Sequence, residues 1–168
     1  PYGDADVRWV NYFPTWGDYF AADEAWREHG GKIGAKINKL MTCGRPDLAG
    51  LIQAGEPAPD ALVKPLYIRV CELKPGNTLA NAMAYRKAVN STQNEQIGST
   101  VGSYMFTPGF GNTGFDYGAM VTGTPKDMAK LMDHSRDGST GKLLTEAGYT
   151  EPGNCNVDLH RSHMMVAQ

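Results

Sequence analysis

A carboxylate and two histidines stand close together near the end of the chain, in residues 157–166 (VDLHRSHMMV). On a strand, Asp158 and His160 share a face and can form an oriented carboxylate–imidazole pair. His163 points to the opposite face, so it cannot bind the same metal ion as His160. We therefore predict no metal site here. The alternative for Asp158 and His160 is a surface ion pair on the last strand.

A second group of reactive residues lies on a predicted strand at 66–73 (LYIRVCEL). Alternation places Tyr67, Arg69 and Cys71 on one face and the aliphatic residues Ile68 and Val70 on the other. We expect the aliphatic face to pack under helices. The mixed face would then line the interior between two sheets.

A buried arginine needs a carboxylate or an anionic ligand to offset its desolvation. Asp116 lies on a neighbouring predicted strand and is the candidate partner of Arg69, as is a carboxylate or enolate ligand. The alternative is an ion pair between domains. The candidate ligand-binding residues are Tyr67, Arg69, Asp116 and His160, and no catalytic residue is assigned.

Aromatic residues cluster near the start of the chain, where Trp9 and Asn11 share a face of a predicted strand at 7–13 and Trp16 follows. Such a set could position a reducible aromatic substrate in a cofactor-free oxygenase. Aromatic residues in strands more often belong to the core, which is the alternative.

The chain has three cysteines, Cys43, Cys71 and Cys155, whose separation excludes a CxxC metal pair. An odd number leaves at least one thiol unpaired, or paired with a cysteine elsewhere. Neither Cys43 nor Cys155 has a base nearby in sequence that would activate a nucleophile. Both a structural thiol and a disulfide remain open.

The glycine-rich stretch 107–114 (TPGFGNTG) is not a phosphate-binding loop, because no Lys-Ser/Thr pair follows it and it opens no helix. It is better explained as a hairpin connection. Phe110 at its tip would serve as a flap or as an oligomer contact.

These residues are positioned by a predicted order of strand, helix, strand, strand, helix and strand, which indicates an α+β fold with an antiparallel sheet. Thr78 and Thr124-Pro125 are typical of helix starts, and Asp137-Gly138 of a break. The predicted elements are strand 66–73, a helix after Thr78, a hairpin of strands 102–107 and 115–122, a helix from Thr124 that resumes at 142–147, and strand 157–166.

The first 56 residues look like the second half of this pattern. They contain the strand at 7–13, a helix capped by Asp18 that breaks at Gly30-Gly31, and a short strand at 48–53. Several residues recur at an offset of about 110, among them Cys43 and Cys155. We therefore predict a duplication in which residues 1–56 are the C-terminal half of one repeat and residues 57–168 are a complete second repeat.

A βαββαβ order is the split-βαβ, ferredoxin-like arrangement. With a strand that ends in Lys74-Pro75-Gly76 before the first helix, the order resembles the dimeric α/β-barrel superfamily, which includes antibiotic-biosynthesis-monooxygenase-like domains. The resemblance is one of fold and covers residues 60–168 well and 1–56 in part. It implies two sheets that close face to face, from two repeats or two chains, and a cavity for a small hydrophobic or aromatic molecule.

The composition of the chain argues against two classes of partner, nucleic acids and membranes. The net charge of −2 offers no basic excess for nucleic acid, and no apolar run approaches the roughly 18 to 20 residues that span a bilayer. We expect no cofactor, no nucleic acid and no membrane insertion. The first residue is not Met, and the content of Gly, Asn and Thr leans towards a secreted or periplasmic protein.

The favoured function is a small-molecule-binding or assembly module that self-associates and carries no recognisable catalytic motif. One alternative is a cofactor-independent monooxygenase or isomerase acting on a small aromatic or enolic substrate. Another is a structural subunit of a larger assembly, favoured by the unpaired sheet edges that an incomplete repeat would leave.

Overall fold

The computed structural model describes residues 9–42, 48–57, 63–110 and 114–163. The chain divides into two compact units, an N-terminal unit Pro1–Pro46 and a C-terminal unit Asp47–Gln168. Each unit is described by itself. The N-terminal unit contains two helices and the C-terminal unit contains a five-stranded sheet with three helices, in the part that the structure describes.

The helices of the N-terminal unit are α1 (Trp16–His29) and α2 (Gly31–Ile37). The predicted helix is confirmed, but its cap is Thr15 and not Asp18. Thr15 and Asp18 form a reciprocal capping box. The predicted break is also confirmed at Gly30, where an added Cβ would lie 2.5 Å from the Trp26 ring.

The predicted strand at 7–13 is not formed in its described part, residues 9–13. A strand persists only when a neighbour accepts its backbone hydrogen bonds. No described strand pairs with these residues. Trp9 instead donates its indole N–H to Asn11 Oδ1 at 3.0 Å, and its exposed fraction of 67% means that it is not a core residue.

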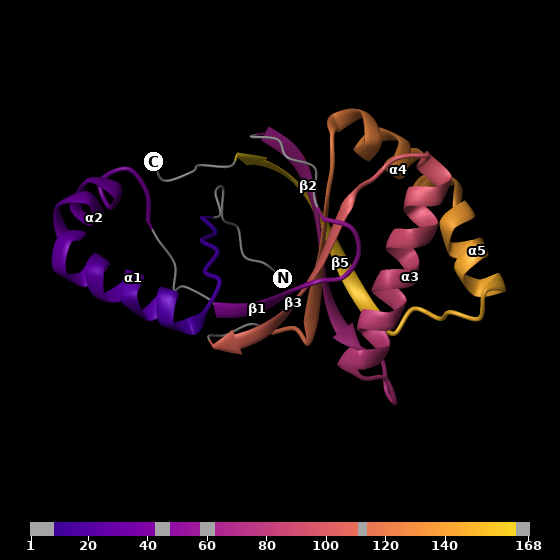
Figure 1. Cartoon of the computed structure of the whole chain (residues 1–168), viewed down its shortest axis with the longest axis horizontal. Coiled ribbons are helices and arrows are strands. Elements are labelled where there is room, and N and C mark those ends of the chain that lie inside the picture. The colour runs from indigo at the N-terminus through magenta and orange to yellow at the C-terminus, as the bar shows by residue number, and fades with distance from the viewer. Residues whose placement is uncertain (1–8, 43–47, 58–62, 111–113, 164–168) are drawn as a thin grey trace. The chain divides into compact units, whose positions relative to one another are not determined.

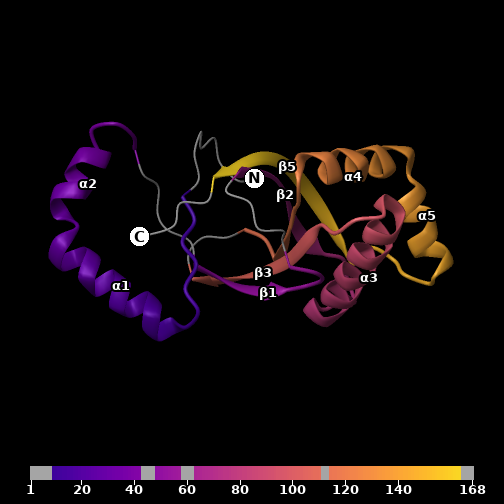
Figure 2. The ribbon, with the colours of Figure 1, turned by 45° about the horizontal axis from the view of Figure 1, so that its top comes forward.

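The sheet of the C-terminal unit is antiparallel throughout, with the order β1-β3-β4-β2-β5 (Figure 1). Its three helices lie on one face of it in both views (Figures 1 and 2). The predicted α+β class with an antiparallel sheet is therefore confirmed. The elements are β1 (Leu48–Gln53), β2 (Val63–Leu73), α3 (Leu79–Ile97), β3 (Gly102–Phe110), β4 (Tyr117–Thr122), α4 (Pro125–Asp137), α5 (Ser139–Glu146) and β5 (Gly153–His163).

The helix signals in the sequence act as predicted. Thr78 caps α3 in a capping box with Asn81, and Thr124 caps α4 with Pro125 as the first helical residue. Gly138 ends α4 with φ of 75°, a left-handed conformation that glycine adopts without strain. This turn separates α4 from α5 at the predicted break.

Strand limits differ from the predicted ones at several ends. β3 runs on to Phe110, so this residue ends a strand and is not the tip of a loop; the rest of the predicted loop, 111–113, lies outside the described residues. β5 begins at Gly153, ahead of the predicted 157, because it pairs with β2 along the whole of that strand. The part of its predicted range beyond 163 also lies outside the described residues.

The strand at 48–53 forms as predicted, but it pairs with β3 at an edge of the C-terminal sheet. The two compact units meet between residues 46 and 47. The duplication, with its boundary between residues 56 and 57, stays a prediction.

The core lies between the sheet and its helices, in two clusters of buried side chains. One surrounds Cys71 and the other surrounds Leu131. The first comprises Ala54, Cys71, Ala82, Met105 and Tyr117; the second comprises Ile97, Val101, Val121, Met128 and Leu131.

The expectation for the two faces of β2 is wrong. Cys71 belongs to the core under the helices and Tyr67 packs against it, so Tyr67, Arg69 and Cys71 share the helix-covered face. Ile68 and Val70 point to the other face. On the helix-covered face Arg69 pairs with Glu151, and Cys71 packs against Ala82 of α3, so both side chains have partners there.

Apolar side chains populate the helix-free face of the sheet. Phe106 is buried there because it contacts Phe115, with ring centroids 5.6 Å apart, and lies over Gly118, where an added Cβ would be 2.0 Å from the ring. Alternate residues of a strand share a face, and so do residues paired directly across neighbouring strands. Starting from Phe106 and Ile68, these two rules place four more apolar side chains on this face: Leu51, Leu66, Val70 and Met120.

Candidate functional site

The structure separates the four candidate ligand-binding residues. Tyr67 and Arg69 face the helices, and Asp116 lies just before β4. His160 pairs with Leu66 across the sheet and therefore points to the helix-free face. The candidates do not converge on one pocket.

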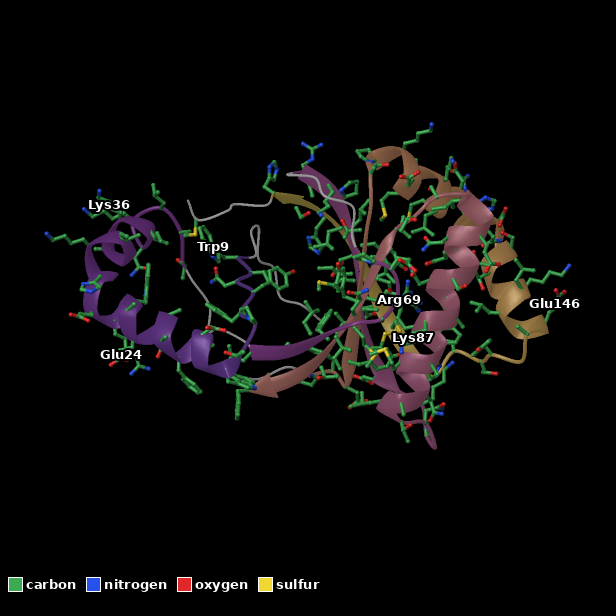
Figure 3. All side chains as sticks on the ribbon, viewed as in Figure 1. Trp9, Glu24, Lys36, Arg69, Lys87 and Glu146 are labelled. Carbon is green, nitrogen blue, oxygen red and sulfur yellow. A yellow bond between two sulfur atoms is a disulfide. The ribbon has the colours of Figure 1, made fainter. Side chains whose placement is uncertain are left out.

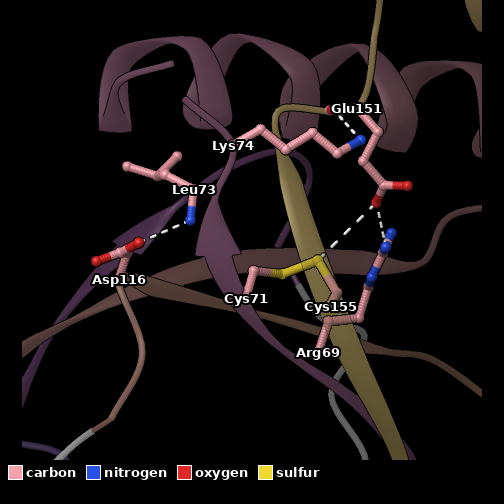
Figure 4. Close-up of a disulfide and its surroundings, with 7 residues drawn as sticks. All are labelled: Arg69, Cys71, Leu73, Lys74, Asp116, Glu151 and Cys155. Atoms are coloured by element: carbon pink, nitrogen blue, oxygen red, sulfur yellow. Dashed lines mark hydrogen bonds and ion pairs between the residues drawn. A yellow bond between two sulfur atoms is a disulfide. The ribbon is translucent and has the colours of Figure 1, made fainter. Parts of the chain in front are cut away.

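Asp116 does not pair with Arg69. Its Oδ2 accepts a hydrogen bond from the backbone N–H of Leu73 at 2.7 Å, and its own N–H donates to the carbonyl of Cys71 at 3.0 Å (Figure 4). These bonds hold the segment before β4 against the end of β2. Asp116 therefore has a structural role at this position.

The partner of Arg69 is Glu151, which lies just before β5 (Figure 4). Arg69 Nη2 contacts Glu151 Oε1, and Lys74 Nζ donates to the Glu151 carbonyl at 2.9 Å. The Nε atom of Arg69 is buried and has no hydrogen-bond partner among the described residues. No local pattern in the sequence marks Glu151 as this partner, because its position depends on how β5 aligns with β2.

A second arginine, Arg86 of α3, enters the same region and is only 4% exposed. Its Nε donates to Ser103 Oγ at 2.8 Å and its Nη2 to Gln93 Oε1 at 3.2 Å. Burial, and then the charge of Arg69, lower the pKa of Arg86 to about 10, so it stays protonated at neutral pH. Its helical spacing with buried Ala82 and Val89 is the signal that could have found it.

Two tyrosines complete the polar surroundings. Burial raises the pKa of Tyr85 and that of Tyr117 above the usual tyrosine range, and the charges of Arg69 and Glu151 act on both phenols. Both hydroxyl groups therefore stay protonated near neutral pH and can donate hydrogen bonds.

These groups surround a small cavity between the sheet and α3. The volume of the cavity that is open to a water-sized sphere is about 10 Å³, which is enough for about one water molecule. Its lining consists of Arg69, Cys71, Ala82, Tyr85, Arg86, Tyr117, Ala119, Glu151 and Cys155.

A disulfide between Cys71 and Cys155 forms one wall of the cavity and joins β2 to β5 (Figure 4). Of the two alternatives left open for Cys155, the structure therefore has the disulfide, with Cys71 as the partner. Cys43 lies outside the described residues.

On the other face, Asp158 and His160 lie on the same side of β5, as predicted. No ion pair joins them. The Nε2 atom of His160 is buried and has no hydrogen-bond partner.

The described residues contain no group of three or more His, Cys, Asp or Glu side chains arranged to hold a metal ion. None of the helices in the described part of the chain is both long enough and apolar enough to cross a membrane.

Comparison with known proteins returned no match to a family model, to a curated protein or to a solved structure.

Proposed function

We propose that the C-terminal unit is an assembly module of the ferredoxin-like type, which packs the helix-free face of its sheet against the same face of a second copy of the chain. The observation that carries this proposal is the one-sided placement of the helices. A sheet with apolar residues on both faces needs a second layer on each. Within the C-terminal unit, helices α3, α4 and α5 supply that layer on one side of the sheet, and no described element of the same unit supplies it on the other (Figure 2).

The topology supports the ferredoxin-like assignment. Strands β2, β3, β4 and β5, with α3 and the α4–α5 pair, follow the βαββαβ order along the chain, and β2 lies between β4 and β5 in the sheet. β1 is then an additional edge strand. The dimeric α/β-barrel arrangement is the known way in which two such sheets cover one another, and it is the assembly that we propose.

The chemistry of the helix-free face suits contact with a copy of itself. Leu66, Ile68 and Val70 project from β2, and Met120 from β4 beside them. Five strands with a spacing of about 4.8 Å, each six to eleven residues long, make a face about 20 Å wide and about 20 to 35 Å long. This footprint is within about a factor of two of the roughly 800 Å² that each partner buries in a standard interface.

Polar residues on the same face favour a two-fold arrangement. Asp158 and His160 stand on β5 at one edge of the face, and they carry groups of opposite charge when the imidazole is protonated. In a two-fold contact, Asp158 of each copy can face His160 of the other copy. The interface then contains two equivalent carboxylate–imidazole pairs. Such reciprocal pairs would fix the register of the two sheets.

A substitution in the middle of the apolar face tests the proposal. We expect Ile68→Lys to weaken self-association at least about 30-fold, because a central interface residue contributes roughly 2 kcal/mol or more and the new charge would be buried. Sedimentation velocity over a range of protein concentrations measures the change. Circular dichroism checks that the variant still folds.

The matched control is Leu143→Lys, which places the same charge at an apolar residue of α5 that is 44% exposed. We expect this variant to associate like the natural chain. Equal association constants for the Ile68 and Leu143 variants would contradict the proposal, because the sheet face would then not be the contact.

A small hydrophobic or aromatic ligand between the two sheets is the binding function that the α/β-barrel resemblance suggests. The aromatic ring of Phe106 and the thioether of Met120 would contact it from this face. The catalytic alternative, a monooxygenase or isomerase, stays a prediction. It depended on Arg69, Asp116 and His160 meeting in one pocket, and they lie apart, so the assembly function comes first.

A further inference from the structure

The cavity under α3 has an excess of positive charge. Arg69 and Arg86 both line it, and among the described residues Glu151 is the one carboxylate in the lining; Figure 4 shows Arg69 and Glu151 together. Arg86 is almost completely buried, and the charge of Arg69 is close enough to lower the pKa of Arg86. Two cations and one anion leave one positive charge that the lining does not compensate.

The partners of Arg86 do not supply the missing negative charge. Ser103 and Gln93 are neutral acceptors, and no ion pair of Arg86 occurs among the described residues. Removing a guanidinium from water without a counter-charge is unfavourable, and neutral hydrogen bonds offset only part of the cost. The Nε–H of Arg69 is also buried without an acceptor. An acceptor that carries negative charge would satisfy both residues.

The remaining lining limits what that acceptor can be. Tyr85 and Tyr117 offer hydroxyl donors, while the disulfide, Ala82 and Ala119 offer no charge. The room of about 10 Å³ for a water-sized sphere admits a single small particle. This small room favours a monatomic anion over a polyatomic one such as phosphate or sulfate.

We propose that the cavity enclosed by Arg69, Arg86, Tyr85 and Tyr117 binds one small monovalent anion of the halide class, with chloride as the common representative. The two guanidinium groups would provide charge-assisted N–H donors and the phenols neutral O–H donors. Bound chloride would neutralise the charge of Arg86, as Glu151 neutralises the charge of Arg69. This site lies on the helix-covered face, so the proposal does not depend on self-association.

Thermal unfolding of the full chain in two sodium salts tests the site. We expect the Tm to rise as sodium chloride replaces sodium gluconate at constant ionic strength, because a ligand that binds only the folded state stabilises it. Gluconate is too large to enter the cavity, and the constant ionic strength removes general screening. A Tm that does not change as chloride replaces gluconate would overturn the proposal.

Variants locate the effect within the chain. Arg86→Gln should weaken the affinity for chloride by about tenfold or more, the loss expected when a hydrogen bond from a charged donor is removed. Lys87→Gln removes the same charge from the neighbouring exposed residue of α3 (Figure 3) and should keep the full response. An undiminished chloride response in Arg86→Gln would overturn the assignment to this cavity.

A direct measurement avoids the risk that Arg86→Gln does not fold. Crystals of the natural chain grown in sodium bromide should show an anomalous scattering peak between Arg69 and Arg86. A water molecule there without anomalous signal, or the carboxylate of a larger ligand reaching in, would overturn the halide proposal. Either result leaves the self-association experiment unaffected, so the two proposals fail separately.

Discussion

At the scale of single residues, the protein places charge where hydrophobic packing would be expected. Arg69 and Arg86 enter the core region between sheet and helix, and Glu151 is the carboxylate that makes this tolerable. Glu151 comes from a segment that is distant in sequence from both arginines. Because Glu151 pairs with the partly buried Arg69, we expect it to contribute more to stability than an acid on the surface.

Glu151→Gln measures this contribution. We expect it to lower the free energy of unfolding by about 1 to 3 kcal/mol, because it leaves two guanidinium groups without a protein carboxylate. Urea denaturation gives the value. The matched control is Glu146→Gln on α5 (Figure 3), an exposed acid whose contact with Lys142 is worth about 0.5 kcal/mol or less. Equal losses in the two variants would show that the buried arginines do not need Glu151.

A second residue-scale prediction concerns pH. Hydrogen bonds from Thr124 and Ser99 hold the pKa of Asp127 below its usual range. An acid with a depressed pKa stabilises the folded state above its unfolded pKa, and this stabilisation is lost as the pH falls through the folded value. We therefore expect Asp127→Asn to be less stable than the natural chain at neutral pH. The difference in the free energy of unfolding should vanish as the pH falls below the usual aspartate range. Urea denaturation at several pH values measures this difference. A difference that stays constant with pH would contradict the account.

At the scale of elements, local sequence signals are sufficient to predict where helices end. The sequence does not show which strands and side chains become neighbours over a long range. Thr78, Thr124, Pro125 and Gly138 fix helix ends through their own backbone and side-chain chemistry, and those ends were predicted. The partners of Arg69 and Cys71 depend on which strands become neighbours. Alternation shows that a strand has two faces but does not say which one the helices cover, and this was the error on β2.

The disulfide is the element-scale feature with the clearest energetic consequence. It joins β2 to β5 across a sequence separation of 84 residues. A loop of that length predicts a stabilisation of about 4.6 kcal/mol in the chain-entropy model, and strain and residual structure commonly reduce the observed value. We expect Cys71→Ser with Cys155→Ser, or reduction of the natural chain, to lower the free energy of unfolding by about 2 to 4 kcal/mol in urea denaturation. A stability that is the same in reducing and oxidising buffer would contradict this.

At the scale of the whole molecule, the C-terminal unit uses the two faces of its sheet for different purposes. The helix-covered face holds the core, the disulfide and the charged cavity. The helix-free face carries apolar side chains from β2, β3 and β4, which in our proposal a second sheet covers. The self-assembly proposal depends on that division, and the halide site depends only on the helix-covered face.

The most direct test of the central claim is the mass of the natural chain in solution, measured by multi-angle light scattering during gel filtration. Self-association through the helix-free face predicts twice the mass of the single chain of 18.2 kDa at micromolar concentration, in chloride and in gluconate alike. A mass of 18.2 kDa that does not change up to high concentration would contradict the account, because no second copy would then cover the sheet.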